Sequence, residues 1–309
     1  MLPTDGDYAR LDALSTEGAR PELAELDLWP TLDAVEVFTA DGAAAAVATR
    51  EAAPSIAAAV DAIAGRMSKG GRLIYIGAGT GGRIAAVDAA EIEPSYGLHG
   101  RVMAVLAGGL EGFTDGREHH EDNGSEGAAA IGSLRPTADD VVFGVSASGR
   151  TPYVLGGIGA GRAAGSLTIG FACTAGSELA RESDLAIEVV TGPEIIAGST
   201  RLKAGTAQKL VLNMISTLVM VRLGRTYGNL MVDVVADNAK LRRRAVRVVV
   251  QATGVDDARA AAALAEAGGR AKVAVVALLG GVDVTRAEAL LHAAAGNARV
   301  AITLADARD

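Results

Sequence analysis

The sequence predicts an α/β fold in which helices flank a doubly wound, largely parallel sheet. Short apolar runs of strand length alternate with segments able to form helices, which is the pattern of βαβ units. Half of the 309 residues are hydrophobic, with Ala prominent among them, the chain also holds 39 Gly, and aromatic residues make up only 3%. Such a composition suits helices packed tightly over a parallel sheet.

The first part of the chain is predicted to be an N-terminal extension over residues 1–45. Pro3, Pro21 and Pro30 interrupt any long helix there. The stretch Met1–Arg20 lacks a basic segment followed by an apolar one, so we expect no signal peptide.

The main α/β domain is predicted over residues 46–250. A helix is expected from Ala43 to Met67, with Pro54 at a boundary between two pieces. The segment 200–223 is the longest apolar helix candidate, and it is too apolar all round for a surface. We therefore expect it in a core or a subunit interface. Five apolar runs are expected to form the strands: Leu73–Ile76, Val102–Leu106, Val141–Val145, Leu167–Phe171 and Leu185–Val190.

The last part of the chain, residues 251–309, is predicted to be a small three-helix domain. Its Ala-rich segments are separated by Gly268-Gly269, Gly280-Gly281 and Gly296. The run Lys272–Leu279 is also compatible with a strand, because periodicity does not separate short buried elements.

Charge and cysteine content exclude several classes of protein. A formal charge of −8 argues against general binding to nucleic acid or to anionic membranes. The single cysteine, Cys173, rules out an internal disulfide and fits a reducing compartment. Gly, Arg or Asp interrupts each apolar run, so we expect no transmembrane helix. These observations predict a cytoplasmic protein.

The first motif that carries chemistry is the glycine-rich run Gly77–Arg83 (GAGTGGR), which follows a predicted strand and precedes a helix. Glycines allow a tight turn, and the helix start presents free N–H groups to an anion. The run also satisfies the dinucleotide pattern G-x-G-x-x-G. That reading requires an acidic residue near the end of the next strand, and Ala107-Gly108-Gly109 stands there instead. A turn that binds no ligand remains open.

The second motif is the hydroxyl-rich run Ser146–Pro152 (SASGRTP), again between a strand and a helix. Its three hydroxyls and one glycine form a compact anion cradle, with Arg150 as charge support. An ordinary helix cap followed by Pro152 is the alternative, and both are compatible.

These two loops are similar to the phosphate-binding loops of sugar isomerase (SIS) domains, where S-x-S-G-x-T is typical. Three further stretches resemble the N-acetylmuramic acid 6-phosphate etherases, which are relatives of the glucokinase regulatory proteins: Asp88–Gly97, Ser199–Thr217 and Tyr227–Val246. The resemblance runs from about Thr16 to the end of the chain. It implies an SIS-type sheet, an amino sugar 6-phosphate as substrate, a homodimer with its pocket near the interface, and no metal or organic cofactor.

The resemblance also implies two catalytic glutamates. Glu91 occupies the glutamate of the family's D-A-S-E element, here DAAE, and Glu121 that of its E-G-A-E-D element, here EHHED. Glu118 and Asp122 keep the other acids of that element. We predict that Glu91 protonates the departing lactate and later activates water, and that Glu121 removes the C2 proton. Without the resemblance, a solvated carboxylate on a helix face is favoured for each.

Further residues are predicted to bind the substrate or its phosphate. For Ser199, Thr200 and Lys203, at the start of the long apolar helix, helix capping is an equal alternative. The others lie in the two loops: Gly79, Thr80, Gly81, Ser146, Ser148, Gly149 and Thr151.

Three positions depart from the etherase pattern. Gly81 stands where Ser is usual, Arg20 where Asn is usual, and Ser146 where Ala is common. We hypothesise that Ser146 replaces the hydroxyl missing at position 81. The departures leave room for a related substrate or for a non-catalytic sugar-phosphate sensor. A nucleotide-dependent oxidoreductase is the weakest alternative.

Overall fold

The computed structural model describes residues 16–114, 120–235 and 239–307, and the chain divides into two compact units. The first unit holds the chain up to Ala90 together with Arg101–Ser216, and the second holds Glu91–Gly100 and the chain from Thr217 onward. These units differ from the three predicted ranges. Two long helices, α4 (Gly79–Tyr96) and α9 (Lys203–Arg222), begin in the first unit and end in the second.

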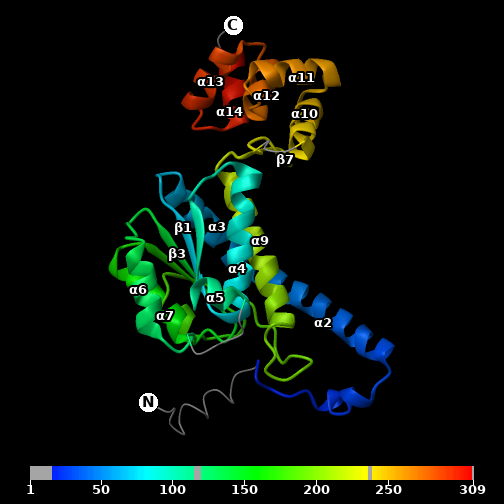
Figure 1. Ribbon diagram of the computed structural model, residues 1–309, viewed down its shortest axis with the longest axis vertical. Helices are drawn as coiled ribbons and strands as arrows, with labels where there is room; N and C mark the ends of the chain where they lie inside the picture. The colour runs from blue at the N-terminus through cyan, green and yellow to red at the C-terminus, as the bar shows by residue number, and fades with distance from the viewer. Residues whose placement is uncertain (1–15, 115–119, 236–238, 308–309) are drawn as a thin grey trace. The chain divides into compact units, whose positions relative to one another are not determined.

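The first unit is built on a parallel sheet of five strands in the order β2-β1-β3-β4-β5 (Figure 1). The chain moves from β1 to β2 on one side and then returns to place β3 on the other side of β1. This arrangement confirms the predicted doubly wound sheet, and the switch of direction falls between β1 and β3. The strands lie at the five predicted places: β1 Leu73–Gly77, β2 Val102–Leu106, β3 Val141–Ser146, β4 Leu167–Ala172 and β5 Leu185–Glu188.

The two central strands are completely buried, as expected for strands covered by helices on both faces. Tyr75 of β1 and Phe143 of β3 meet edge to face with ring centroids 5.5 Å apart. The Tyr75 hydroxyl donates to Asp88 of α4 at 3.1 Å, and Ser216 of α9 donates to the other carboxylate oxygen at 3.0 Å. Burial, together with Asp88, raises the pKa of Tyr75 well above its usual value. This buried polar group ties β1 to both long helices.

Helices precede and connect the strands. Pro54 lies in the first turn of α3 (Ala53–Met67), so the predicted break is present, and the preceding helix α2 (Thr31–Glu51) begins well before Ala43. Two short 3₁₀ turns, η1 (Pro21–Leu23) and η2 (Leu26–Leu28), come before α2. The remaining helices of this unit are α5 Gly109–Thr114, α6 Gly124–Ser133, α7 Pro152–Ala163 and α8 Glu178–Arg181.

Helix α9 corrects the expectation that every apolar run is too short or too interrupted to have the length of a transmembrane helix. By length and composition alone it is long and apolar enough to cross a membrane, and 56% of its most apolar stretch is buried inside the protein. A buried core helix of a soluble protein has the same length and composition, so this feature is weak evidence for a membrane span. The predicted burial of segment 200–223 agrees with Val211, Leu212, Ile215, Val219 and Met220, each fully buried.

The second unit is mainly helical. Lys272–Leu279 belongs to a helix, so the strand alternative is wrong. Within the described part of residues 251–309, four helices begin where three were predicted. A small hairpin, β6 (Thr226–Tyr227) with β7 (Leu230–Met231), leads into them. The helices are α10 Ala239–Thr253, α11 Asp257–Glu266, α12 Ala271–Leu279, α13 Val284–Ala293 and α14 Ala298–Asp306.

A buried cation holds the second unit together around α12. The Lys272 ammonium is 2.5 Å from Asp233 and donates to the carbonyls of Gly224 at 2.9 Å and Gly296 at 3.0 Å. Burial lowers the pKa of Lys272, and Asp233 opposes that effect. The ammonium therefore joins the segment around the β6–β7 hairpin to the loop before α14.

Candidate functional site

A hollow of about 510 Å³ lies in the first unit at the carboxyl ends of β1 and β3. Ligands of open α/β sheets bind at this position, where the strand order reverses. The hollow is mostly polar, and its walls come from three loops and the N-terminal segment. Its lining residues are Glu17, Ala78, Gly79, Thr80, Gly81, Arg83, Glu121, Ser146, Ala147, Ser148, Thr151, Gly198, Ser199, Thr200, Arg201 and Gln208.

The loop after β1 brings the start of α4 to the hollow. Gly79, Thr80 and Gly81, which were predicted to bind the phosphate, all line it. The turn itself depends on close backbone contact, because a Cβ on Gly82 would lie 2.4 Å from Leu106 and 2.7 Å from the Gly77 carbonyl carbon.

The loop after β3 is organised by its own hydroxyls. Ser146 Oγ lies 2.8 Å from Thr151 Oγ1 and accepts a hydrogen bond from the Gly149 N–H at 3.0 Å. Ser148 Oγ accepts from the Arg150 N–H at 3.3 Å. Ser146, Ser148 and Thr151 line the hollow together, so the three predicted hydroxyls converge on one space.

Gly149 does not line the hollow but fixes the shape of this loop. Its φ is +64°, and a Cβ there would lie 2.4 Å from the Cβ of Ser177. Its carbonyl accepts from the Leu179 N–H at 2.9 Å. The loop therefore turns back tightly against the segment that follows β4.

The turn before α9 contributes Ser199 and Thr200 to the lining, but Lys203 lies elsewhere. The Lys203 ammonium, 8% exposed, donates to the Pro193 carbonyl at 2.6 Å and lies 3.4 Å from Asp41. The capping role at this helix start belongs to the buried Glu194. Its carboxylate accepts from the N–H groups of Lys203 at 2.8 Å and Ala204 at 2.9 Å.

Arg20, one of the departures from the etherase pattern, contacts the same carboxylate as Lys203, that of Asp41. Its guanidinium donates to Asp41 at 2.8 Å and to Glu22 at 2.9 Å. The hydrogen bond to Glu22, and then Asp41, raises the pKa of Arg20 against the effect of burial. Arg20 thus neutralises the carboxylate that also faces Lys203, and it holds the N-terminal segment against α2.

The two predicted catalytic glutamates have different positions. Glu121 lines the hollow, and its carbonyl accepts from the Tyr153 N–H at 2.9 Å. Glu91 is an exposed residue of α4. It stands twelve residues after Gly79, which corresponds to about 18 Å along the helix axis. Glu118 of the same family element lies outside the described residues.

Seven lining residues were not predicted as site residues, and four of them carry polar or charged side chains. Glu17 lies beside the turn before α9, since a Cβ on Gly198 would be 2.9 Å from its carboxylate. Arg83 donates to the Gly112 and Phe113 carbonyls. Arg201 and Gln208 flank the start of α9. Arg83 belongs to the first glycine-rich loop, and Arg201 and Gln208 belong to the stretch Ser199–Thr217 that carries the family resemblance, so the available signal covered these three.

Metal and thiol chemistry find no support in the described residues. Residues 16–114, 120–235 and 239–307 contain no group of three His, Cys, Asp or Glu side chains placed to hold a metal ion. Cys173 is completely buried, and burial, followed by the charge of Glu194, raises the pKa of its thiol to about 12. A thiol in this environment is inert.

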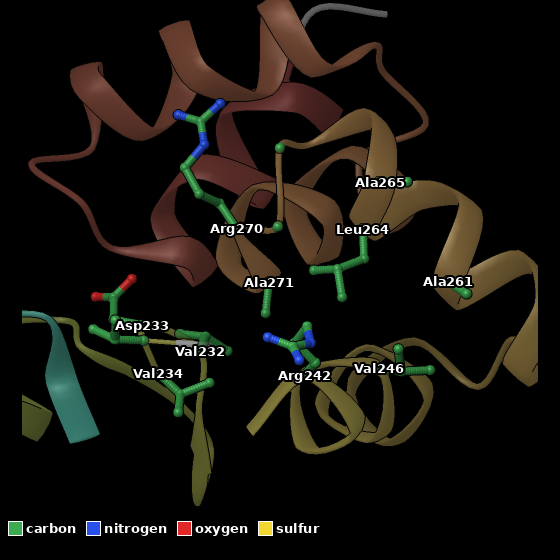
Figure 2. Close-up of a pocket in the computed structure, with 13 residues that line it drawn as sticks. Val232, Asp233, Val234, Arg242, Val246, Ala261, Leu264, Ala265, Arg270 and Ala271 are labelled. Atoms are coloured by element: carbon green, nitrogen blue, oxygen red, sulfur yellow. The ribbon is translucent and has the colours of Figure 1, made fainter. Parts of the chain in front are cut away.

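A second hollow, of about 620 Å³, lies in the second unit, where side chains of α10, α11 and the segment before α12 surround it (Figure 2). Its walls are mainly apolar, with Val232, Val234 and Leu264 among them. Two of its charged groups are already paired, Asp233 with Lys272 and Arg270 with Glu288. The hydroxyl-rich hollow of the first unit is therefore the better candidate for a sugar phosphate.

Comparisons with known proteins identify the domain. Residues 55–161 match the glucokinase regulatory protein N-terminal SIS domain, and residues 129–218 match the SIS domain. Together with the parallel sheet, these matches define an SIS-domain protein. Among solved structures, a phosphoheptose isomerase from Francisella tularensis is 18% identical, with a TM-score of 0.47 over 62% of this chain and 98% of that one. A phosphoheptose isomerase from Neisseria gonorrhoeae is also 18% identical, with a TM-score of 0.42 over 62% of this chain and 99% of that one.

The curated relatives are more specific. An N-acetylmuramic acid 6-phosphate etherase from Rubrobacter xylanophilus is 54% identical over 86% of this chain and 88% of its own. Another from Streptomyces coelicolor is 53% identical over 81% of this chain and 80% of its own. The chain belongs to the N-acetylmuramic acid 6-phosphate etherase family.

Proposed function

We propose that this protein cleaves the D-lactyl ether of N-acetylmuramic acid 6-phosphate, giving N-acetylglucosamine 6-phosphate and D-lactate. The observation that carries the proposal is the joint presence of family membership and a polar hollow with an anion cradle and a carboxylate. The reaction belongs to the recycling of cell-wall amino sugars, and we place it in the cytoplasm.

The phosphate is proposed to bind between the two loops. The first residues of α4, whose N–H groups have no partner within the helix, line the same hollow as Ser148 and Thr151. Neutral donors of this kind bind a phosphate through hydrogen bonds and the helix dipole. Gly79, Thr80 and Gly81 would supply the helix side of the cradle, and Ser199 and Thr200 the opposite wall.

The chemistry requires one base and one acid. Opening of the sugar ring exposes an aldehyde that acidifies the C2 proton. We propose that Glu121, which lines the hollow, removes this proton and that the C3–O bond then breaks. The departing lactate is proposed to be protonated by Glu91, a role that rests on the family resemblance alone, since Glu91 is not among the residues that line the hollow. The resulting C2–C3 double bond accepts water at C3, activated by Glu91, and C2 regains a proton. Lactate leaves with the proton it received, so atoms and charges balance.

The decisive experiment measures D-lactate released from N-acetylmuramic acid 6-phosphate by purified protein. Wild type is expected to release lactate and Glu91→Gln to release none. Glu93→Gln, which changes an exposed carboxylate on the same helix, is the matched control and should keep its activity. If wild type releases no lactate yet binds the substrate, the etherase proposal fails.

The division of labour between the two glutamates is tested by exchange of the C2 proton in deuterium oxide. We expect Glu91→Gln to exchange this proton without releasing lactate, and Glu121→Gln to lose the exchange. Asp122→Asn, a change of the neighbouring exposed acid, is the control. Normal exchange in Glu121→Gln would show that another group is the base.

A non-catalytic sugar-phosphate sensor is the second candidate. The observation that favours it is the match of residues 55–161 to the domain of the glucokinase regulatory proteins. In that case, the glutamine variants of Glu91 and Glu121 would bind sugar phosphates as wild type does, and no variant would release lactate.

We also propose that the protein is a homodimer. Large apolar side chains remain exposed along α2, with Leu32 at 67%, Val35 at 52% and Phe38 at 44%. Their spacing places them on one face of the helix. An exposed apolar stripe of this kind is typical of a surface covered by a partner. Light scattering should give the mass of two chains, and Val35→Glu should shift it toward that of one.

A further inference from the structure

The proposed substrate carries two anionic groups, the phosphate on C6 and the carboxylate of the lactyl ether on C3. We propose that Arg201 binds the lactyl carboxylate and so distinguishes the ether substrate from the product. This inference rests on the proposed function and names a specificity-determining residue for it.

The hollow needs a cation for this second anion. The phosphate is served by neutral N–H and hydroxyl groups of the two loops. Two of the other lining residues, Glu17 and Glu121, are carboxylates. Both repel a bound carboxylate unless a positive charge lies close to it. A positive side chain at the hollow must therefore compensate.

Two of the nearby cations are already engaged. Arg83 lines the hollow, but its guanidinium donates to the Gly112 carbonyl at 2.9 Å and to the Phe113 carbonyl at 3.2 Å. Lys203 donates to a carbonyl at 2.6 Å and lies 3.4 Å from Asp41. Either would have to give up buried or half-buried partners before it could bind a ligand.

Arg201 is the cation that lines the hollow without such hydrogen bonds or ion pairs among the described residues. It lines the hollow, its side chain is exposed, and across the three described segments it makes no hydrogen bond or ion pair. Its guanidinium offers parallel N–H donors that match the two oxygens of a carboxylate. A lysine has the charge without this geometry.

Backbone hydrogen bonds hold the turn around Arg201. The Thr200 N–H donates to the Gly198 carbonyl at 2.9 Å, the Leu202 N–H to Ser199 at 3.1 Å, and the Gly205 N–H to Thr200 at 2.9 Å. Ser199 and Thr200, the two residues before it, line the hollow. The turn therefore holds the Arg201 stem at the rim, from which the guanidinium closes on the ligand.

The consequence is a difference in affinity between substrate and product. The product N-acetylglucosamine 6-phosphate has the phosphate but no lactyl carboxylate. Compared with the substrate, it therefore lacks only the contact with Arg201. A charge-assisted hydrogen-bonded pair changes affinity by roughly 10- to 100-fold. Arg201→Gln should thus raise the KM for N-acetylmuramic acid 6-phosphate by about that factor and leave the Kd of the product within about twofold.

The test compares Arg201→Gln and Arg201→Lys with Arg50→Gln, which removes an exposed arginine from the end of α2. KM comes from lactate release, and the Kd values of substrate and product come from calorimetry in the Glu91→Gln background. The lysine variant should lie between wild type and the glutamine variant, and Arg50→Gln should match wild type. Thermal unfolding confirms that each variant is folded.

Two results would overturn the proposal: an unchanged substrate affinity in Arg201→Gln, or an equal loss of affinity for substrate and product. The second would indicate a role in phosphate binding or in loop structure. Failure of the proposed function gives a different result, because wild type would then release no lactate. The ratio of the two Kd values in the Arg201 variants still tests the inference in that case.

Discussion

Ser146 Oγ and Thr151 Oγ1 lie 2.8 Å apart, and they close the loop after β3 from both of its ends. Ser146 also accepts from the Gly149 N–H and is only 4% exposed. Its hydroxyl therefore supports the shape of the loop, even though the residue lines the hollow. We therefore extend the hypothesis that Ser146 replaces the phosphate-binding hydroxyl missing at position 81: the Ser146 hydroxyl also holds the loop in shape.

The first prediction concerns that hydroxyl. Ser146→Ala leaves the Gly149 N–H without its acceptor and Thr151 without its partner. The loss of one or two such bonds corresponds to about 1 kcal/mol each, or roughly tenfold in affinity. We expect a roughly tenfold higher Kd for N-acetylglucosamine 6-phosphate, measured by calorimetry, and a melting temperature lower by about 2–4 °C for each kcal/mol lost.

Ser133→Ala serves as the control, because this hydroxyl also makes a hydrogen bond, to a carbonyl of its own helix, but lies at the exposed end of α6. It should bind the sugar phosphate as wild type does. An unchanged affinity in Ser146→Ala would show that the loop keeps its shape without the hydroxyl and would end the compensation hypothesis.

The second prediction separates backbone strain from steric overlap. Gly149 and Gly176 both have positive φ, +64° and +62°. A Cβ on Gly149 would lie 2.4 Å from Ser177 Cβ, whereas a Cβ on Gly176 meets nothing within 4 Å. We expect Gly176→Ala to cost about 1 kcal/mol of unfolding free energy and Gly149→Ala more than ~3 kcal/mol. Urea unfolding measures both, and equal costs would contradict the overlap.

The third prediction concerns acid stability. Asp140, just before β3, accepts from the Arg72 guanidinium at 2.7 Å and from the N–H groups of Arg72 at 2.7 Å and Thr137 at 2.8 Å. Burial raises the pKa of Asp140, but the hydrogen bonds from Arg72 and Thr137 outweigh burial and lower it to about 2. A lowered pKa in the folded state stabilises the protein above the unfolded value of about 4. That stability is lost as pH falls toward 2.

Asp140→Asn should therefore reduce the free energy of unfolding by about 2 kcal/mol at neutral pH. The difference from wild type should shrink as pH falls from about 4 toward 2, because wild type then loses the same charge. Urea unfolding across this pH range measures the effect. Asp139→Asn, one residue earlier and exposed, is the control. A difference that stays constant with pH would show that the charge of Asp140 does not contribute.

The sheet could be predicted from the sequence because each strand is a short apolar run bounded by turn residues. The five runs from Leu73 to Val190 all became strands, and Pro54 separated two helices as expected. Lys272–Leu279 could not be assigned, since Val and Ala suit a buried helix as well as a strand. Its helical state follows from packing against α10, α13 and α14, and local propensity does not contain that information.

The candidate site could be predicted only where its residues are neighbours in the sequence. The loops at Gly79–Gly81 and Ser146–Thr151 carry their glycines and hydroxyls side by side, so they could be recognised directly. Lys203 was expected at the ligand, but it is committed to Pro193 and Asp41. Those partners lie ten residues and more away along the chain, and nothing in the local sequence shows that the fold brings them together.

The last prediction concerns Gln208, which the sequence did not single out. This residue is 1% exposed and lines the hollow, and its side chain makes no hydrogen bond within the part of the chain that the structure describes. Its amide lies next to Gly81, where an added Cβ would be 3.1 Å from Nε2. The amide reaches the hollow and has no protein partner there among the described residues, so we expect a bound ligand to hydrogen-bond with it.

Gln208→Leu should therefore separate stability from binding. Removal of the unpaired amide, with similar volume, should leave the melting temperature unchanged or higher. The Kd for N-acetylglucosamine 6-phosphate should rise about tenfold, because the ligand loses a hydrogen bond and meets an apolar side chain. Asn213→Leu, an exposed amide further along α9, is the control and should bind normally. A lower melting temperature with unchanged affinity would mean that the amide serves the fold, and the hollow would then bind its ligand through the two loops and the turn before α9 alone.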